Sequence, residues 1–248
     1  MTASLIRKLE NFTRLSTADK LALGEAVVAT RNLDPGESAC HEGDPVRALH
    51  LVEDGWACDY RQLENGGRQI VAFRLPGDLC GTSASVLAAA DCTRVALTRL
   101  TVHELSPARI EEIAAARPRL RRALRWDEQV GASILREWLV SLGRRDGLER
   151  LAHLLCELYH RQRAVGLAEG GACPMPVTQE ILAAALGQTS VHINRTLQTL
   201  RACGLVTLRN RRLTVPDLAA VEVVAGFSPA YLHLGRAGAH LDALPSEI

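Results

Sequence analysis

Residues Val177 to Val215, VTQEILAAALGQTSVHINRTLQTLRACGLVTLRNRRLTV, carry the clearest fold signal in the C-terminal half of the chain. Two short amphipathic segments flank Gly187, and Thr178 is a good N-cap for the first of them. The second begins behind Thr189 or Ser190. Its apolar residues recur at helical spacing and predict one buried face, at Ile193, Leu197 and Leu200. Two short helices joined by a glycine-containing turn predict a helix-turn-helix, a motif whose second helix enters the DNA major groove.

The residues turned away from that buried face suit contacts with base edges. Arg195 can donate two hydrogen bonds to guanine, and Asn194 and Gln198 can pair with adenine. Val191 can pack on a thymine methyl group. We therefore expect DNA contacts from the two helix starts, the second helix and a following pair of arginines: Thr178, Gln179, Thr189, Ser190, Val191, His192, Asn194, Arg195, Gln198, Arg209 and Arg211.

A basic hairpin is predicted directly after the second helix. Leu205–Leu208 and Arg212–Val215 have the pattern of two short strands around Arg209-Asn210-Arg211, which makes a winged helix-turn-helix. From Thr178 to Val215 there are five arginines and one glutamate, although the formal net charge of the chain is only +1. This local positive charge favours contact with phosphate. The alternative, two helices packed in an unrelated α domain, explains neither the wing nor the arginines.

Composition places the chain among soluble globular proteins. Its 248 residues suffice for two modest domains, and 47% are hydrophobic. No apolar run approaches the roughly 20 residues that span a bilayer, and the N-terminus lacks a signal-peptide pattern. We therefore expect a cytoplasmic protein without membrane contact. Seven scattered cysteines without a CxxC pair argue against a disulfide framework, structural zinc or an iron–sulfur cluster held by four cysteines.

The N-terminal half has the texture of an antiparallel roll. Between Arg31 and Leu105, short alternating runs such as Gln69–Phe73 are separated by glycine-bearing turns such as Asn65-Gly66-Gly67. A roll of this kind can hold a small ligand in its interior. At Pro118, a good first helical residue, the pattern switches to helix.

A long helix is predicted from Arg119 to Leu142, roughly 36 Å at 1.5 Å per residue. Residues that alternate at intervals of four and three predict a two-stranded dimer seam along this helix, at Leu120, Leu124, Ile134 and Trp138. Asp127 falls in the same row and fits an apolar seam poorly. The alternative is a helix packed only on its own roll. Asp146-Gly147-Leu148-Glu149 has the pattern of a capping box, which makes the short break before it a hinge. Gly166–Pro176 is expected to be a loop.

The order of roll, long helix, hinge and winged helix-turn-helix resembles the Crp/Fnr family of bacterial transcription regulators. The most specific matches are Pro76-Gly77-Asp78-Leu79, Arg136–Arg145 and Gln188–Arg195, and the tail Gly226–Leu234 resembles that of the FixK-like group. The resemblance implies an α+β protein with three parts: a cyclic-nucleotide-binding-like roll over 1–118, a dimerisation helix and hinge over 119–143, and a winged helix-turn-helix with its tail over 144–248. It also implies a homodimer on palindromic double-stranded DNA, with RNA polymerase as a further partner.

Several positions depart from the family pattern. Members that bind cyclic nucleotides hold the phosphate with a Gly-Glu pair and an arginine, whereas the matching pocket here is degenerate, at Gly81, Thr82, Ser83 and Asp91. Asp91 would repel a phosphate, and Arg94 is expected on the wrong side of its strand. We therefore expect a regulator that cyclic AMP does not gate. At Val191, members with the familiar half-site carry glutamate, so a different half-site is expected.

Three other constellations have structural explanations as well as functional ones. His153, Cys156 and His160 share a helix face that offers metal ligands, but no fourth ligand is evident. Cys80 could be an axial haem thiolate, yet no histidine is near it in sequence. Cys203 could be an oxidation switch, but burial against the wing is favoured. A redox or ligand-binding enzyme would need a catalytic cluster, and the sequence contains no recognisable one. We expect no catalytic residue, metal or cofactor.

Overall fold

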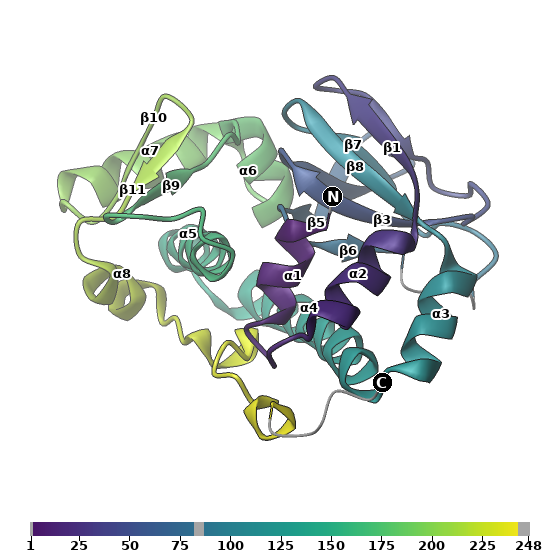
Figure 1. Cartoon of the computed structure of the whole chain (residues 1–248). Helices are drawn as coiled ribbons and strands as arrows, with labels where there is room; N and C mark the ends of the chain where they lie inside the picture. Colours follow the sequence, from purple (N-terminus) through teal and green to yellow (C-terminus); the bar gives the residue numbers. More distant parts are fainter. Residues whose placement is uncertain (1, 82–86, 243–248) are drawn as a thin grey trace. The chain divides into compact units, whose positions relative to one another are not determined.

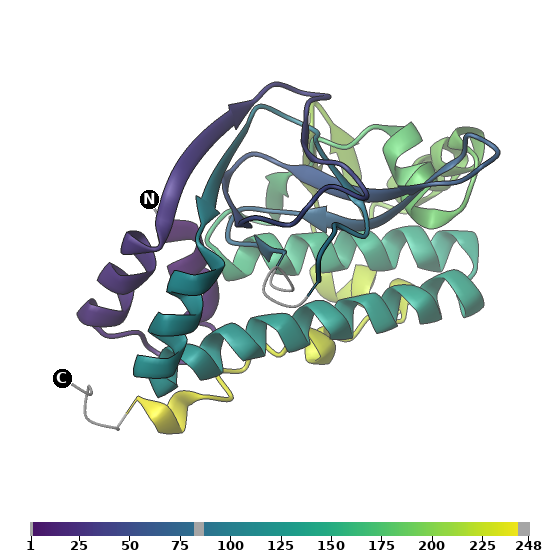
Figure 2. The ribbon, with the colours of Figure 1, turned by 90° about the vertical axis from the view of Figure 1, so that its right-hand side faces the viewer.

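The computed structural model describes residues 2–81 and 87–242 (Figure 1). These residues form two compact units. The first comprises the described residues up to 59, residues 73–132 and those from 233 onward, and the second comprises 60–72 and 133–232. The long helix α4 (Pro118–Arg144), unbroken in Figure 2, therefore contributes its first half to one unit and its second half to the other. None of the described helices combines the length and apolarity that a membrane span requires.

The N-terminal roll consists of two four-stranded sheets in the orders β1-β8-β3-β6 and β2-β7-β4-β5. Apolar residues from both sheets, such as Val52 and Ala57, form a core between them. The predicted roll is confirmed. Its strands are β1 (Val27–Leu33), β2 (Ser38–Cys40), β3 (Leu49–Asp54), β4 (Ala57–Gln62), β5 (Arg68–Arg74), β6 (Leu79–Cys80), β7 (Thr93–Ala96) and β8 (Leu100–Leu105).

A second apolar core joins the helices of this unit to the β3–β8 side of the roll. Leu5, Leu23 and Leu120 are fully buried in it. The helices are α1 (Ala3–Leu9), α2 (Thr17–Glu25), α3 (Pro107–Ala116) and the first half of α4. Helix α3 goes beyond the sequence expectation, which marks a helix start only at Pro118. Pro107 is a second such start, capped by the Ser106 hydroxyl.

A buried charge cluster explains why Asp127 fits a dimer seam poorly. Its carboxylate lies 2.6 Å from the ammonium of Lys8 on α1, and the same ammonium lies 2.7 Å from Asp78. Burial favours the neutral form of Lys8, but the two carboxylates outweigh it and raise the pKa of Lys8. Burial raises the pKa of Asp127 despite its cationic partner. Lys8 thus connects α1, the Pro76–Leu79 turn and α4.

Most of the predicted dimer seam lies inside the single chain. Leu120, Leu124 and Trp138 are buried within the single chain and are not free to line such a seam, whereas Ile134 is half-buried and its place in a seam stays a prediction. The physical reason is that α4 must first cover its own chain, and its most apolar stripe does so. The large apolar residues that α4 leaves exposed are Leu135, Leu139 and Val140, with exposed fractions of 58%, 73% and 50%.

The second unit is built on α5 (Gly147–Ala164), which the predicted Asp146–Glu149 capping box begins. Around it lie the helices and a three-stranded sheet of order β10-β11-β9. Strand β9 pairs with β11 inside the segment expected to be a loop, because backbone pairing rather than side-chain periodicity makes it a strand. The elements are β9 (Ala172–Pro174), α6 (Gln179–Leu186), α7 (Ser190–Ala202), β10 (Thr207–Arg209), β11 (Arg212–Thr214) and α8 (Leu218–Ala225).

The tail after α8 ends in two short 3-10 helices, η2 (Pro229–Leu232) and η3 (Ala239–Leu241). The second belongs to the first unit, where backbone N–H groups of the tail donate to carbonyl oxygens in the α1–α2 loop, Gly238 to Phe12 over 3.1 Å. The Asp242 carboxylate accepts from the Thr13 hydroxyl and the Arg14 backbone N–H, both at 2.8 Å. This part of the tail therefore packs on the first residues of the chain.

Candidate nucleic-acid interface

The two helices of the motif start where the sequence predicts. The Thr178 hydroxyl accepts from the Ile181 N–H, and the Thr189 hydroxyl accepts from the His192 N–H, each at 3.2 Å. Each bond satisfies one of the N–H groups that a helix start leaves without an intrahelical partner. Gly187 ends α6 in the left-handed region at φ +61°, which only glycine adopts at low cost. The turn between the helices is therefore set by local chemistry.

Helix α7 buries Ile193 and Leu200 completely and turns its other face to solvent. Val191 is 61% exposed, which is unusual for a β-branched apolar residue. Arg195 is exposed, and its guanidinium makes no hydrogen bond or ion pair within the described part of the chain. An apolar group and an unpaired guanidinium four residues apart lie on the same helix face. This face can offer both kinds of groove contact.

An amide chain connects the two helices of the motif. The Asn194 side-chain N–H donates to Gln179 over 3.0 Å, and Gln198 donates to the Asn194 oxygen over 2.8 Å. Asn194 is half-buried and uses both its amide nitrogen and its oxygen in this chain. Gln198 keeps its own oxygen for another partner, so it is better placed than Asn194 to reach a base edge.

The wing is a tight hairpin with a basic tip. β10 pairs antiparallel with β11 in a register that places Arg209 opposite Arg212. Asn210 and Arg211 both have positive φ, 51° and 58°, as a two-residue type I′ turn requires. Arg209 and Arg211 are exposed. The predicted wing is confirmed.

The roll encloses a second polar site, the charge cluster of Asp59 on β4, Arg74 on β5 and Arg94 on β7. Arg94 donates to both oxygens of Asp59, at 2.8 and 3.0 Å, and Arg74 donates at 2.8 Å. Asp59 is 1% exposed. Burial alone would raise its pKa, but Arg74 and Arg94 outweigh burial and lower it. His50 lies 3.2 Å from Arg94, and burial together with that arginine lowers the pKa of His50 to about 4.

Family models match both halves of the chain. A Crp-like helix-turn-helix domain matches residues 149–223, and a cyclic nucleotide-binding domain matches residues 30–117. The nitrogen fixation regulation protein FixK of Bradyrhizobium diazoefficiens is 30% identical over 77% of this chain and 79% of its own length. The transcriptional activator protein FnrL of Cereibacter sphaeroides is 29% identical over 84% of this chain and 85% of its own. The chain belongs to the Crp/Fnr family.

A solved Crp/Fnr-type structure has the same fold. FixK2 from Bradyrhizobium japonicum superposes with a TM-score of 0.72 at 22% identity, over 81% of this chain and 98% of its own. The regulators named among the relatives make this protein a DNA-binding transcription regulator rather than an enzyme. The region matched by the Crp-like helix-turn-helix domain contains α6, α7 and the wing.

Near the expected degenerate nucleotide pocket of this Crp/Fnr chain, one residue lies differently from the sequence expectation. Arg94 is 5% exposed and points into the roll, so the expectation that it lies on the wrong side of its strand is wrong. Asp91 is exposed. Gly81 has φ +74°, while Thr82 and Ser83 lie outside the described residues.

The structure corrects one expectation about cysteines and bears on a second. Cys203, expected to be buried against the wing, is exposed at the C-terminal cap of α7, because the helix ends before the wing covers it. Cys80 is buried, and burial raises the pKa of its thiol, which disfavours a haem thiolate. Among the described residues no group of three or more histidine, cysteine or acidic side chains could hold a metal ion.

The histidines of α5 have partners other than metal. His160 lies 2.6 Å from Glu222, and His153 lies 3.3 Å from Glu137. Phe227 and Tyr231 of the tail pack around their rings. The face of α5 with His153, Cys156 and His160, considered above as possible metal ligands, is thus the face on which the first part of the tail packs.

Three polar residues at these sites escape sequence reasoning, namely Asp59, Arg74 and Arg150. A buried aspartate in an otherwise apolar strand, Ala57-Cys58-Asp59, is the available signal for the first. Arg74 gives no signal, because an arginine at a strand end is ordinarily exposed. Arg150 donates to three backbone carbonyls, and carbonyl acceptors leave no trace in a sequence.

Proposed function

We propose that the protein binds a palindromic operator as a homodimer and reads base edges with α7. The observation that carries this proposal is the pair Val191 and Arg195 behind the capped start of α7, beside a basic wing. Arg195 would contact guanine, Val191 a thymine methyl and Gln198 adenine. Thr178, Gln179, Thr189, Ser190 and His192 at the helix starts, together with Arg209 and Arg211, would contact phosphate.

A second copy of this chain is the proposed occupant of the exposed apolar face of α4. Leu135 and Leu139 are four residues apart and therefore adjacent on one helix face. Two such helices in two-fold symmetry would remove these leucines from water. Two-fold symmetry also matches two half-sites one helical turn apart. RNA polymerase is the proposed further partner, and the cytoplasm the proposed location, since a bacterial regulator acts there.

We propose that cyclic nucleotides do not gate this regulator. The buried guanidinium that could hold a cyclic phosphate, Arg94, is already paired with both oxygens of Asp59. A phosphate would have to displace a buried carboxylate or lie beside it, and either is costly. Calorimetry with cyclic AMP and cyclic GMP tests this, and micromolar binding of either nucleotide would contradict it.

A salt titration of binding to duplex DNA tests the DNA-binding proposal directly. The operator is first selected from a random duplex library with the purified protein. Submicromolar binding should weaken steeply with salt, with a log–log slope of about −0.9 for each neutralised phosphate. A flat salt response, or equal affinity for selected and scrambled duplexes, would contradict sequence-specific binding.

A further inference from the structure

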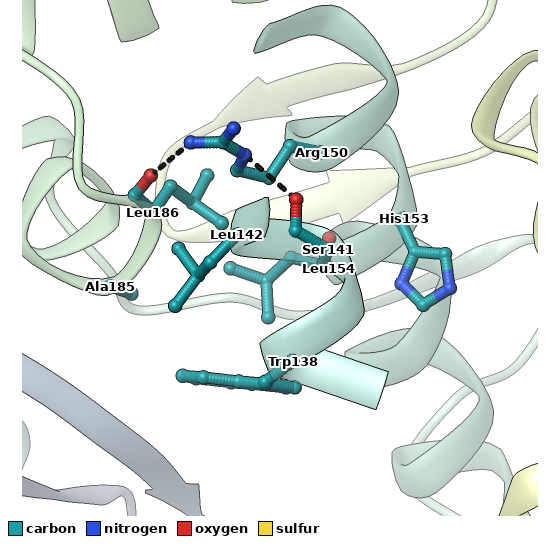
Figure 3. Close-up of a pocket in the computed structure, with 8 residues that line it drawn as sticks. All are labelled: Trp138, Ser141, Leu142, Arg150, His153, Leu154, Ala185 and Leu186. Atoms are coloured by element: carbon teal, nitrogen blue, oxygen red, sulfur yellow. Dashed lines mark hydrogen bonds between the residues drawn. The ribbon is translucent and has the colours of Figure 1, made fainter. Parts of the chain in front are cut away.

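Arg150 lies one turn inside α5 and donates to three backbone carbonyls at once. Nε donates to Ser141 over 3.2 Å, and the two terminal nitrogens donate to Leu186 and Arg145, each over 2.9 Å. Figure 3 shows the side chain reaching from α5 across to the carbonyls of Ser141 and Leu186. All three nitrogens of the guanidinium are used, and arginine alone among the side chains has donors for such an arrangement.

The three carbonyls lie in the last turn of a helix or in the link between two helices. Ser141 is in the last turn of α4, Arg145 is in the two-residue link to α5, and Leu186 is the last residue of α6. The final carbonyls of a helix have no intrahelical partner and form the negative end of its macrodipole. The Ser141 carbonyl also accepts the backbone N–H of Arg145 over 3.2 Å, so Arg150 is a second donor there, and it is the donor to the Leu186 carbonyl at the end of α6. One cation therefore bonds carbonyls at the C-terminal ends of the long helix and of the first helix of the helix-turn-helix.

The space around Arg150 excludes a ligand. It is lined by Trp138, Leu142, Leu154 and Ala185 among others (Figure 3). The cavity volume is about 10 Å³. A volume of that size accommodates about one water molecule. The guanidinium is also half-buried, with its donors engaged by backbone, so it is not a phosphate contact. Arg150 therefore acts on the protein itself.

The start of α5 also meets the recognition helix. A Cβ placed on Gly147 would lie 2.2 Å from Nε2 of His192 and 3.0 Å from Nε2 of Gln188. The joint between α4 and α5 therefore contacts α6 through Arg150, and it contacts the turn and the start of α7 through Gly147. Both helices of the motif are anchored to the end of α4 within the same unit.

We propose that Arg150 is a positioning residue for operator recognition, which fixes the orientation of the helix-turn-helix relative to the C-terminal end of α4. This rests on the proposed dimer, in which α4 is the shared axis. If α7 is held rigidly to α4 in each copy, the distance between the two recognition helices is set, and with it the preferred spacing of the half-sites. Base preference within a half-site comes from α7 itself and does not depend on Arg150.

The test compares operators that differ only in the spacing of their half-sites. Duplexes with the selected palindrome, and with one base pair removed or added at its centre, are titrated with wild type, Arg150→Gln and Arg150→Lys. The wild type should prefer one spacing by about tenfold or more, and Arg150→Gln should reduce that preference to about threefold or less. Arg150→Lys keeps the positive charge but lacks the planar guanidinium with its several donor nitrogens. Its spacing preference should therefore lie between those of the wild type and Arg150→Gln.

Two controls separate positioning from other roles. Arg122→Gln removes an exposed arginine of α4 and should leave both spacing and base preference unchanged. Arg195→Ala should alter base preference and keep the spacing preference. Binding of a single half-site by Arg150→Gln, and its base preference there, should match the wild type.

Three results would overturn the inference. The first is an unchanged spacing preference in folded Arg150→Gln, and the second is an equal loss of affinity at every spacing and on the single half-site. The third result applies if Arg150→Gln does not fold: it is a wild-type spacing preference in the Arg150→Lys variant. Failure of the wild type to bind any selected duplex would instead reject the proposed function.

Discussion

At the scale of single residues, the exposed face of α7 combines side chains that we propose contact DNA for different physical reasons. Arg195 has two parallel donors for a guanine edge, whereas Val191 offers only apolar contact. Arg209 and Arg211 stand at the tip of a two-residue turn, where a charge meets phosphate more readily than a base edge. These differences separate the effects of substitutions.

We predict that Arg195→Ala flattens base preference at one position of each half-site, at a cost of about 1–3 kcal/mol per contact. Val191→Glu should shift preference towards cytosine, whose amino group can donate to a carboxylate. Arg211→Ala should instead weaken all sequences alike and reduce the salt slope by about one. Competition binding on a panel of half-site variants measures all three. If Arg211→Ala changes base preference and Arg195→Ala does not, the wing rather than α7 lies in the groove.

His153 predicts a particular dependence of stability on pH. Burial, and then Arg145, lower its pKa to about 4, although Glu137 acts in the opposite direction. Tyr231 and Phe227 pack on the ring. The pKa of His153 is therefore lower in the folded state than the ordinary value of about 6.5 in the unfolded chain, so the unfolded chain binds a proton more readily. The resulting stabilisation is fully present above about pH 6.5 and is lost as pH falls towards 4.

We expect His153→Gln to remove up to about 3 kcal/mol of the stability difference between pH 4 and pH 7. Urea unfolding across this pH range measures the free energy of unfolding of the variant and of the wild type. The contribution of the carboxylates is common to both proteins and cancels in the difference. The exposed His240→Gln serves as the matched control. Parallel pH profiles for wild type and His153→Gln would show that His153 is not buried in its neutral form.

At the scale of elements, α4 has two faces with different tasks. Its most apolar stripe, including Leu120 and Trp138, covers its own chain, and Leu135 and Leu139 remain exposed. The indole N–H of Trp138 donates to buried Glu157 over 2.9 Å, so Trp138→Asp would place a second carboxylate there and break the fold. The residues that test pairing between copies are the exposed leucines.

We predict that Leu139→Asp converts the dimer to monomer, weakening association by at least about 100-fold, because two buried leucines are worth about 1.5–3 kcal/mol each. Sedimentation equilibrium measures this. Leu21→Asp, at a leucine of α2 that is 64% exposed, is the matched control and should remain dimeric. A Leu139→Asp protein as dimeric as the wild type would place the interface elsewhere.

Lys8 connects α1 to α4 through a buried pair of carboxylates, and its removal leaves them without this cation. We predict that Lys8→Met costs about 3–5 kcal/mol of stability, whereas Lys20→Met, which breaks a partly exposed pair with Glu10, costs about 0–1 kcal/mol. Because the folded-state pKa of Asp127 is already raised, the Lys8→Met deficit should shrink as pH falls and Asp127 takes up a proton. Denaturant unfolding at pH 7 and pH 5 measures both effects. An equal deficit at the two pH values would contradict this account.

At the scale of the whole molecule, the last described residues return to the first. The tail packs on residues 11–14, and Gly238 lies so close to Phe12 that a Cβ would stand 2.6 Å from its ring. The Arg236–Asp242 ion pair closes the segment. The N-terminal and C-terminal ends of the described chain therefore share one packing surface.

We predict that Gly238→Ala releases this tail and costs about 1–3 kcal/mol, as overpacking generally does. Limited proteolysis should then cut between residues 233 and 242 faster than in the wild type. Gly235→Ala is the matched control, since nothing lies within 4 Å of the position that its methyl group would take. Equal cleavage rates for the two variants would show that the Phe12 contact does not hold the tail.

Features that arise from neighbouring residues follow from the amino-acid sequence alone. The caps at Thr178 and Thr189, the glycine stop at Gly187 and the hairpin at Asn210-Arg211 are local, so the pattern of residues is enough to locate the helix-turn-helix and its wing. Alternation and turn glycines likewise predict the roll. The physical reason is the short range of these forces, which act within a few residues along the chain.

Packing determines which side of each element is buried and which polar groups meet. Heptad spacing does not distinguish the stripe of α4 that covers its own chain from the one left for a partner, and alternation puts Arg94 on the wrong side of its strand. Asp59 and Arg94, 35 residues apart, and the carbonyls that Arg150 caps come together only when sheets and helices pack. Burial of a charge depends on partners distant in sequence, and no local pattern records them.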